Sequence, residues 1–377
     1  MRENSKFKNA KAAKNDEFYT LYSDIQKEVN AYVEYNPDVF RDKVVLLPCD
    51  DPEWSNFTKF FAQNFENFGL KKLISTSFAS NSKVVQLNKQ ISLFEMNSPQ
   101  FDEKITNSRG KIFVLERDVN NSGTIDIDDL EWSYLEGDGD FRSEEVKKLR
   151  DEADVIVTNP PFSLFREFLM WITEAEKQFL MIGNINCITY KEVFTRIMKN
   201  KVWLGNGMGR WISGFIVPES YELYGLEARI DDDGNRIVST NNCLWLTNLE
   251  HGRRHQPLSL MTMEDNIKFS KHKEIKGKGY PMYDNYEAIE VPFADAIPND
   301  YQGVMGVPIT FLDKYCPEQF EILGITDRQN TSGLRTKKYT FEDSPKYNDL
   351  NARSVLKLDN GEYKQVYARI LIKKVLI

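Results

Sequence analysis

Short apolar runs alternate with longer amphipathic stretches along the 377-residue chain. An apolar run without polar alternation, bounded by turn residues, is typical of a parallel strand covered on both faces. Runs that predict strands occupy residues 44–47, 71–76, 111–116, 155–158, 178–183, 202–204, 215–217, 243–246 and 366–375. Apolar positions at helical spacing predict helices over residues 21–35, 55–68, 163–177 and 190–200. Because strands alternate with helices, the pattern predicts an α/β fold with a parallel sheet.

Residues 154–162 are the most informative stretch. The run 155–158 predicts a buried strand, and Asn159-Pro160-Pro161-Phe162 ends it because the prolines cannot continue a hydrogen-bonded ladder. Helical spacing begins directly afterwards. A strand that ends here and turns into a helix places the four residues at the carboxyl edge of the sheet, where open α/β folds bind their ligands.

The Asn-Pro-Pro-Phe stretch carries the groups that amine chemistry needs. The amide of Asn159 offers an acceptor, and proline has no N–H, so the carbonyls around Pro160 remain free to accept. Two acceptors can bind both hydrogens of an exocyclic amine and aim its lone pair at an electrophile, while Phe162 offers a face for stacking a planar ring. No side chain here is a strong general base. Methyl transfer from S-adenosylmethionine to an amino nitrogen therefore fits, and a chance Pro-Pro loop is the alternative.

Composition predicts a soluble globular protein, since 41% of the residues are hydrophobic and 28% are charged. No apolar run approaches the roughly 20 residues of a membrane helix, and the polar N-terminus lacks a signal-peptide core. The four cysteines are scattered without a CxxC pair, which fits a reducing compartment and argues against a zinc or disulfide framework. We expect a cytoplasmic protein without membrane contact or a bound metal.

The net charge of −8 does not indicate a nucleic-acid-binding protein, but a local basic face can lie on an acidic protein. Residues 251–278 are basic and polar. A second cationic set lies in the Gly/Ser/Thr-rich stretch 325–351 and comprises Arg328, Arg335, Lys337, Lys338 and Lys346. Residues 1–14 are polar and basic, which is typical either of a frayed tail or of an arm that contacts phosphate.

Residues 118–129 match a calcium-binding loop at several positions, with Asp129 where a bidentate Glu is expected. A strand-like run precedes the loop where a helix is expected, and no second loop of this kind follows. We therefore favour a surface hairpin with Asn/Gly turn chemistry over a calcium site.

Several segments together resemble the EcoRI-type adenine-specific DNA methyltransferase family. Asn159-Pro160-Pro161-Phe162 is similar to the fourth motif of amino-methyltransferases. The form of this motif that ends in Phe is typical of N6-adenine enzymes. The resemblance also covers residues 15–20, 48–52, 137–141, 158–165, 188–192, 245–249, 283–287 and 303–312, and so extends over most of the chain. It implies a Rossmann-like, doubly wound, mostly parallel sheet with S-adenosylmethionine as cofactor, an adenine flipped out of double-stranded DNA as target, and a C-terminal target-recognition region. By that reading residues 1–250 are the catalytic domain and residues 251–377 bind DNA.

The resemblance also implies roles for individual residues. Asn159 and the Pro160 carbonyl would hold the target N6, and Phe162 would stack on the flipped base. Pro161 belongs to the same catalytic motif. The residues implied to bind the cofactor, in addition to Asn159, are Phe18, Tyr19, Thr20, Pro48, Cys49, Asp50, Asp140 and Phe141. The carboxylate of Asp140 would accept from the cofactor's amino group. One departure is that residues 48–52 lack the glycines of the usual first motif, which leaves open whether Asp50 or Asp51 contacts the cofactor.

Two alternatives remain open from the sequence. A protein-glutamine methyltransferase would use the same amine chemistry, although such enzymes usually carry Tyr at the position of Phe162. A catalytically silent DNA-binding relative would have lost the reaction, which the intact Asn159 argues against. We expect a monomer without an obligate protein partner, in a restriction-modification system or as an independent modification enzyme. The recognition sequence cannot be read from one chain, because base contacts depend on groove geometry.

Overall fold

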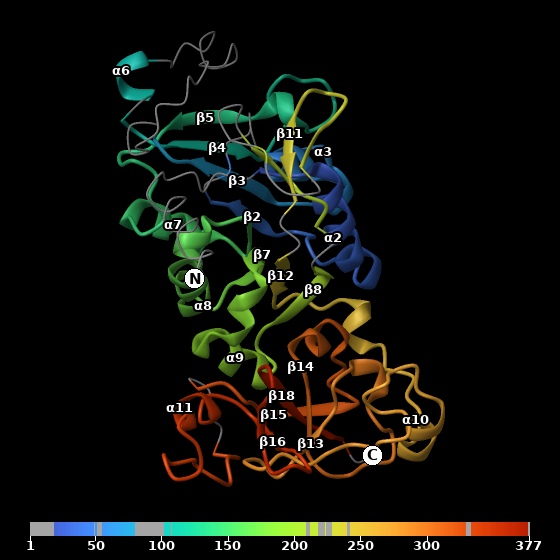
Figure 1. The fold of residues 1–377 in the computed structure, drawn as a ribbon. Helices are drawn as coiled ribbons and strands as arrows, with labels where there is room; N and C mark the ends of the chain where they lie inside the picture. Colours follow the sequence, from blue (N-terminus) through green and yellow to red (C-terminus); the bar gives the residue numbers. More distant parts are fainter. Residues whose placement is uncertain are drawn as a thin grey trace. The chain divides into compact units, whose positions relative to one another are not determined.

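The fold is taken from a computed structural model, which describes residues 19–48, 50, 55–79, 102–106, 108–208, 212–217, 223, 228–239, 242–328 and 333–375. The chain divides into two compact units (Figure 1). The first comprises Met1–Ile185 and Gly205–His251, and the second comprises Asn186–Leu204 and Gly252–Ile377. Within the described ranges, no helix has both the length and the apolar character needed to span a membrane.

An eight-stranded sheet organises the first unit, in the order β5-β4-β3-β2-β6-β7-β12-β8. The strands are β2 (Val44–Leu47), β3 (Lys72–Ser77), β4 (Lys111–Leu115), β5 (Glu131–Tyr134), β6 (Val155–Thr158), β7 (Gln178–Asn184), β8 (Trp203–Met208) and β12 (Cys243–Thr247). The central strands β3, β2, β6 and β7 run parallel to one another. β4, β5 and β12 pair antiparallel with their neighbours. The predicted Rossmann-like α/β fold is thereby confirmed.

The strand order reverses between β2 and β6. From β2 the chain passes through α3 (Asn56–Gln63) to β3, and from β6 it passes through α8 (Phe165–Glu174) to β7 on the other side. The two helices lie on opposite faces of the sheet (Figure 1), as right-handed crossovers in opposite directions require. The carboxyl ends of β2 and β6 therefore form the topological switch point, where open α/β sheets bind ligands.

The predicted helices of the first unit form with small changes at their ends. The other helices that the structure describes in this unit are α2 (Tyr22–Tyr35), α4 (Phe65–Phe68), α6 (Glu103–Thr106), α7 (Glu144–Glu152) and the 3-10 turns η2 (Ile127–Asp129) and η3 (Phe162–Leu164). The predicted helix 55–68 is interrupted at Asn64 and ends at Gly69, whose φ of 62° is the left-handed conformation that glycine adopts readily. Phe57, Phe60 and Phe61 of α3 are fully buried and attach this helix to the sheet.

A second, small sheet contains one of the strands predicted from the apolar runs. Its order is β1-β9-β11-β10, and its strands are β1 (Tyr19–Thr20), β9 (Phe215–Val217), β10 (Arg229–Ile230) and β11 (Arg236–Val238). The strand predicted over residues 215–217 forms as β9, and it pairs with β1 and β11 and not with the eight-stranded sheet. The hydrophobic pattern records that a strand is buried and carries no information about its partner.

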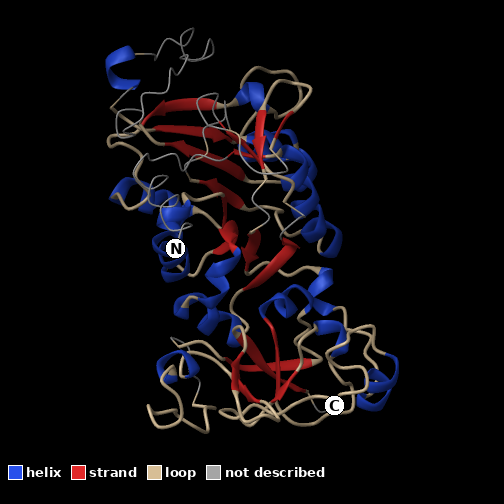
Figure 2. Cartoon of the chain, viewed as in Figure 1, coloured by secondary structure: helices blue, strands red, loops and turns tan. Residues whose placement is uncertain are grey.

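The second unit contains a four-stranded mixed sheet, in the order β13-β14-β18-β15, and a separate hairpin of β16 and β17. Its strands are β13 (Ile289–Glu290), β14 (Met305–Pro308), β15 (Phe320–Ile325), β16 (Val355–Lys357), β17 (Tyr363–Gln365) and β18 (Arg369–Lys374). Its helices are α9 (Lys191–Met198), α10 (Met263–Phe269), α11 (Tyr347–Leu350) and the 3-10 turns η4 (Ile185–Thr189, from the last residue of the first unit), η6 (Gly252–His255), η7 (Ala294–Ala296) and η8 (Ile309–Lys314). Loops connect these short elements (Figure 2). The predicted last strand is confirmed as β18, and α9 packs against β15.

Candidate active site

Asp50 lies where β2 ends at the switch point, and side chains from three other elements surround it. Its Oδ1 accepts a hydrogen bond from Ser55 Oγ at 2.8 Å, and its Oδ2 accepts one from Thr158 Oγ1 at 3.2 Å. Its backbone carbonyl accepts from Thr58 Oγ1 at 2.9 Å and from Ser75 Oγ. Asp50 thus ties the start of α3 to the carboxyl ends of β3 and β6.

The environment of Asp50 favours the neutral carboxyl group. The residue is 7% exposed, and its described partners are hydroxyl groups. Burial raises the pKa of Asp50 to about 7, against the opposing effect of the hydrogen bonds from Ser55 and Thr158. A carboxyl group with this pKa changes charge near neutral pH, which is a property common at functional sites.

Strand β6 directly precedes the Asn-Pro-Pro-Phe stretch, and its last residue, Thr158, fixes it to the end of β2. Thr158 Oγ1 donates to the Pro48 carbonyl at 3.0 Å as well as to Asp50. Asn159 follows directly and is half-buried, and Pro160 is buried. A single hydrogen bond therefore joins Asp50, which is predicted to contact the cofactor, to Thr158. Thr158 directly precedes Asn159, whose amide is predicted to bind the target amine.

The second half of the stretch turns the chain into α8. The Pro161 carbonyl accepts from the Leu164 amide at 2.8 Å, which opens the 3-10 turn η3. Phe162 is half-buried and packs edge-to-face on Phe215 of β9, with 6.3 Å between ring centroids and 86° between the rings. Phe162 also lies against the main aromatic core of the first unit, so its position is fixed by packing.

The N-terminal strand β1 lies beside this edge. Thr20 pairs with Phe215 in the antiparallel β1–β9 ladder, and its carbonyl accepts from Asn56 Nδ2 at 2.8 Å at the start of α3. Thr20 is 3% exposed, and its Oγ1 has no hydrogen-bond partner among the described residues. A buried hydroxyl group without a partner is unusual, so this atom is a candidate contact for a bound ligand. Its neighbour Tyr19 is half-buried in the same strand.

The loop of residues 137–141 lies at the carboxyl end of β3. The Asp138 carbonyl accepts from the Ala79 amide at 2.8 Å, and Gly139, at φ +85°, lies so close to the Ser77 carbonyl that a Cβ would be 2.3 Å from its oxygen. Only glycine fits there. The loop therefore shares the sheet edge with Asp50.

The two site candidates of this loop have partners of their own. Asp140 accepts from Arg142 through Nε at 2.9 Å and Nη2 at 2.6 Å, and these bonds hold the pKa of Asp140 below its usual range. Phe141 is buried and stacks on Phe168 at 4.0 Å, with Trp171 edge-on at 5.7 Å. The structure thus anchors this loop on α8, and the cofactor contacts predicted for Asp140 and Phe141 stay predictions.

The residues predicted for the site lie along one edge of the sheet where the structure describes them. Direct hydrogen bonds connect Pro48 and Asp50 with the strand that precedes Asn159, and Thr20 connects through Asn56. Phe18 and Cys49 lie outside the described residues. Sequence reasoning missed Ser55 and Thr158 as partners of Asp50. The available signals were a Ser directly before the helical stripe, where it caps α3, and a Thr at the end of an apolar strand.

Residues 118–129 connect the antiparallel strands β4 and β5, so the predicted hairpin is confirmed. Asn121 and Gly123 have positive φ values of 58° and 90°, as Asn/Gly turn chemistry requires. Asp129 accepts from the backbone amides of Asp126, Asn120 and Val119, which lowers its pKa. In the described part of the chain, no group of three or more His, Cys, Asp or Glu side chains is arranged to hold a metal ion.

Comparison with known proteins agrees with this geometry. Residues 6–375 match the family described as adenine-specific methyltransferase EcoRI. The chain is 49% identical over 314 residues to the Type II methyltransferase M.EcoRI of Escherichia coli, covering 83% of this chain and 87% of that protein. It is 32% identical over 370 residues to the Type II methyltransferase M.MpnI of Mycoplasma pneumoniae, covering 98% of both chains. No solved structure matches the chain.

The fold is Rossmann-like, and the family match makes the chain a methyltransferase of this class. The chain belongs to the adenine-specific methyltransferase EcoRI family, and it is a DNA adenine methyltransferase of the restriction-modification type. The predicted family and enzyme class, an adenine-specific DNA methyltransferase, are thereby confirmed. Membership of this family removes the protein-glutamine alternative, while the roles of individual site residues stay predictions.

Proposed function

We propose that the enzyme transfers a methyl group from S-adenosylmethionine to the N6 of an adenine that is flipped out of double-stranded DNA, with the reaction taking place at the β2–β6 switch point. The observation that supports this is the Asp50–Thr158 hydrogen bond of 3.2 Å. It joins the end of β2, which carries the proposed cofactor residues, to the residue directly before Asn159. Donor and acceptor of the methyl group would then be bound at one sheet edge.

The residues at this edge fit the proposed cofactor. S-adenosylmethionine has hydroxyl, amino and carboxylate groups, and when bound it supplies a methyl group on a positively charged sulfur. The buried Thr20 Oγ1 lacks a partner among the described residues, and Asp50 can change charge near neutral pH. Tyr19, Pro48, Asp140 and Phe141 would complete the contacts, together with Phe18 and Cys49.

Asn159 and Pro160 would bind the target amine. The Asn159 side-chain oxygen and the Pro160 carbonyl would each accept one N6 hydrogen, which orients the nitrogen lone pair and fixes its position. Pro161 has φ −52° and ψ 125° and starts the turn that presents Phe162. Phe162, held edge-on by Phe215, would stack on the extruded adenine. These residues supply position and polarisation and need no strong base.

The second unit would read the DNA sequence. The proposed functional division stays at residues 1–250 for catalysis and 251–377 for target recognition. Basic segments 251–278 and 325–346 would contact phosphates, so binding should weaken steeply with salt. We further propose that the enzyme acts as a monomer in the cytoplasm, with no obligate protein partner, and that a restriction endonuclease of the same specificity can accompany it.

The test is incubation of the purified enzyme with tritiated S-adenosylmethionine and either plasmid DNA or cell protein. We expect label in the DNA, located at N6 of adenine, and sequencing of the modified plasmid would then give the recognition sequence. Label confined to protein would overturn the proposal.

A further inference from the structure

A pocket of about 530 Å³ lies in the second unit, away from the methyl-transfer residues in the sequence. The apolar lining residues with accessible surface are Met282, Val304 and Leu334, whereas Tyr286, Ala288 and Leu371 are each at most 2% exposed. Pockets of this size are typical of small-ligand sites.

Two cations line the same pocket, Arg335 and Lys373. The Arg335 guanidinium donates to the Tyr286 hydroxyl through Nη2 at 3.2 Å and Nε at 3.4 Å, and its central carbon lies 5.6 Å from the Tyr286 ring centroid. Lys373 lies opposite Glu321 in the β15–β18 register. Neither cation forms an ion pair with a carboxylate among the described residues, although Glu287 also lines the pocket. Half-buried cations without acidic partners favour an anionic ligand.

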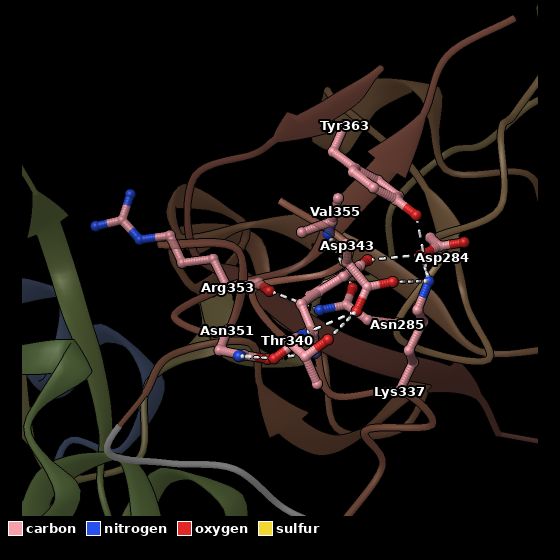
Figure 3. Close-up of polar contacts among 10 residues, drawn as sticks. Asp284, Asn285, Lys337, Thr340, Asp343, Asn351, Arg353, Val355 and Tyr363 are labelled. Carbon is pink, nitrogen blue, oxygen red and sulfur yellow. Dashed lines mark hydrogen bonds and ion pairs between the residues drawn. The ribbon is translucent and has the colours of Figure 1, made fainter. Parts of the chain in front are cut away.

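A polar network around Lys337 holds the segment that carries Arg335 in place. Lys337 Nζ lies 3.0 Å from Asp284 Oδ2 and 3.4 Å from the Tyr363 hydroxyl, and Figure 3 shows its ammonium group between these residues. The Tyr339 hydroxyl donates to the same Asp284 oxygen at 2.7 Å.

Backbone contacts fix the segment on both sides of Lys337. The Thr336 amide donates to the Asn285 carbonyl at 3.0 Å, and the Tyr339 amide donates to Asn351 Oδ1 at 2.9 Å. Asn285 is fully buried and in turn binds the backbone of Arg353 and Val355 (Figure 3). Arg335 is therefore presented by a prearranged backbone, which lowers the entropy cost of binding.

The neighbouring cations of this segment differ in environment. Lys337 is engaged by Asp284, whereas Lys338 is exposed and has no partner among the described residues. Of the three cations at 335, 337 and 338, Arg335 alone lines the pocket. The sequence shows three similar basic residues, and the structure assigns them three different environments.

We propose that this pocket is a nucleotide subsite for the DNA, with a phosphate bound by Arg335 and Lys373 and the attached base against Met282, Val304 and Leu334. Glu287 could accept from an exocyclic amino group of that base. This inference rests on the proposed function and adds to it a residue, Arg335, that positions the DNA. A free mononucleotide carries the same phosphate and base as a nucleotide of DNA. The test therefore distinguishes DNA from a free nucleotide as the ligand of this pocket.

The test compares three variants of the full-length enzyme with plasmid DNA as the probe: Arg335→Gln, Lys337→Gln and Lys338→Gln. Each removes one positive charge from the same segment. Arg335→Gln should raise the KM for DNA about tenfold, leave kcat and the KM for S-adenosylmethionine within about twofold, and reduce the salt-dependence slope of DNA binding by about one. Arg335→Lys should restore that slope but only part of the KM, because the ammonium group lacks the guanidinium fork.

The control variants separate the subsite from general charge and from folding. Lys338→Gln should raise the KM for DNA less than about threefold, and Lys337→Gln should lower the melting temperature, which Arg335→Gln should leave near that of the wild type. If Arg335→Gln changed the KM for DNA no more than Lys338→Gln does, the subsite would be refuted while wild-type methyl transfer to DNA stood. A wild-type enzyme that methylated no DNA would overturn the proposed function and the subsite together.

A titration with deoxyadenosine monophosphate distinguishes DNA from a free nucleotide. We expect its dissociation constant to exceed about 1 mM, because the isolated nucleotide lacks the contacts of the neighbouring phosphates. Tighter binding that is lost in Arg335→Gln, combined with an unchanged KM for DNA, would assign the pocket to a free nucleotide and refute the DNA subsite.

Discussion

Two carboxyl groups, Asp50 in the first unit and Asp284 in the second, show how different neighbours give one residue type different properties. Asp50 is buried among hydroxyl groups, and burial raises its pKa to about 7. Burial also acts to raise the pKa of Asp284, but hydrogen bonds from the Tyr339 hydroxyl and Lys337 outweigh it and hold the pKa below its usual range. The first carboxyl group can change charge near neutral pH, whereas the second remains ionised.

This difference distinguishes the sheet edge around Asp50, where we place the reaction, from the network around Asp284, which stabilises the fold. At the sheet edge, the polar groups bind one another and one buried hydroxyl, Thr20 Oγ1, is left without a partner among the described residues. In the second unit, Asp284 is compensated by a cation and its neighbours hold a loop in place. We therefore expect changes at the edge to affect transfer, and changes around Asp284 to affect stability first.

The largest expected effect is that of Asn159→Ala. It removes one of two proposed acceptors for the target amine, so methyl transfer should fall by at least about 1,000-fold, comparable with loss of a transition-state contact. Cofactor affinity, measured by calorimetry, should change less than about fivefold. The neighbouring exposed Ser163→Ala is the control and should keep wild-type activity. Lost cofactor binding with normal transfer would contradict the assigned roles.

Asp284→Asn should destabilise the protein by about 1–3 kcal/mol at neutral pH, because it weakens hydrogen bonds to a charged group. The folded-state pKa of Asp284 is lowered, so its stabilising contribution is present above the ordinary carboxyl pKa and is lost as the pH falls through the folded value. Urea unfolding at several pH values measures this. If the difference in unfolding free energy between wild type and variant did not change with pH, the result would argue against an ionised Asp284.

Asp50→Asn should change the pH dependence of stability in the opposite direction. Because the folded-state pKa of Asp50 is raised, the neutral group stabilises the fold at low pH, and this contribution is lost as the pH rises from about 4 towards 7. The wild-type melting temperature should fall relative to that of Asp50→Asn by roughly 3–6 °C over this range. Parallel curves for the two proteins would show that Asp50 has an ordinary pKa in the fold.

Thr158→Val should have the smallest effect of the set on methyl transfer. It removes the hydrogen bonds to Pro48 and Asp50 while keeping the shape of the side chain, so transfer should fall about threefold to tenfold. The buried acceptors left without this donor should cost about 1–3 kcal/mol of stability. The ratio of kcat to KM for the cofactor measures it. If transfer stayed at the wild-type level, the link between β2 and the Asn-Pro-Pro-Phe stretch would have no part in positioning Asn159.

The centre of the fold could be predicted from the sequence because its strands are continuous apolar runs. β2 and β6 form where the pattern indicates, and the Asn-Pro-Pro-Phe stretch lies at the end of β6. Helix α7 was missed because Val146 is its only buried residue, which leaves no apolar stripe. Its signals were the capping Ser143, the acidic first turn and Arg150 near its end.

Partners between distant segments could not be predicted. Asp50 binds Thr158 across 108 positions, and Lys337 binds Asp284 across 53. The sequence shows which side chains are polar, and only the fold determines whether a cation meets a carboxylate or lines a pocket. For this reason the basic stretch 325–346 was predicted as one patch, while the structure gives Arg335, Lys337 and Lys338 separate environments.

The most direct test of the central claim is to digest plasmid DNA to nucleosides after incubation with S-adenosylmethionine and to measure N6-methyldeoxyadenosine by mass spectrometry. With the wild-type enzyme we predict that this nucleoside accumulates until every recognition site is modified, and that Asn159→Ala forms it only at background level. Accumulation by Asn159→Ala at the wild-type rate, or its absence with the wild-type enzyme, would contradict adenine methylation at the β2–β6 edge.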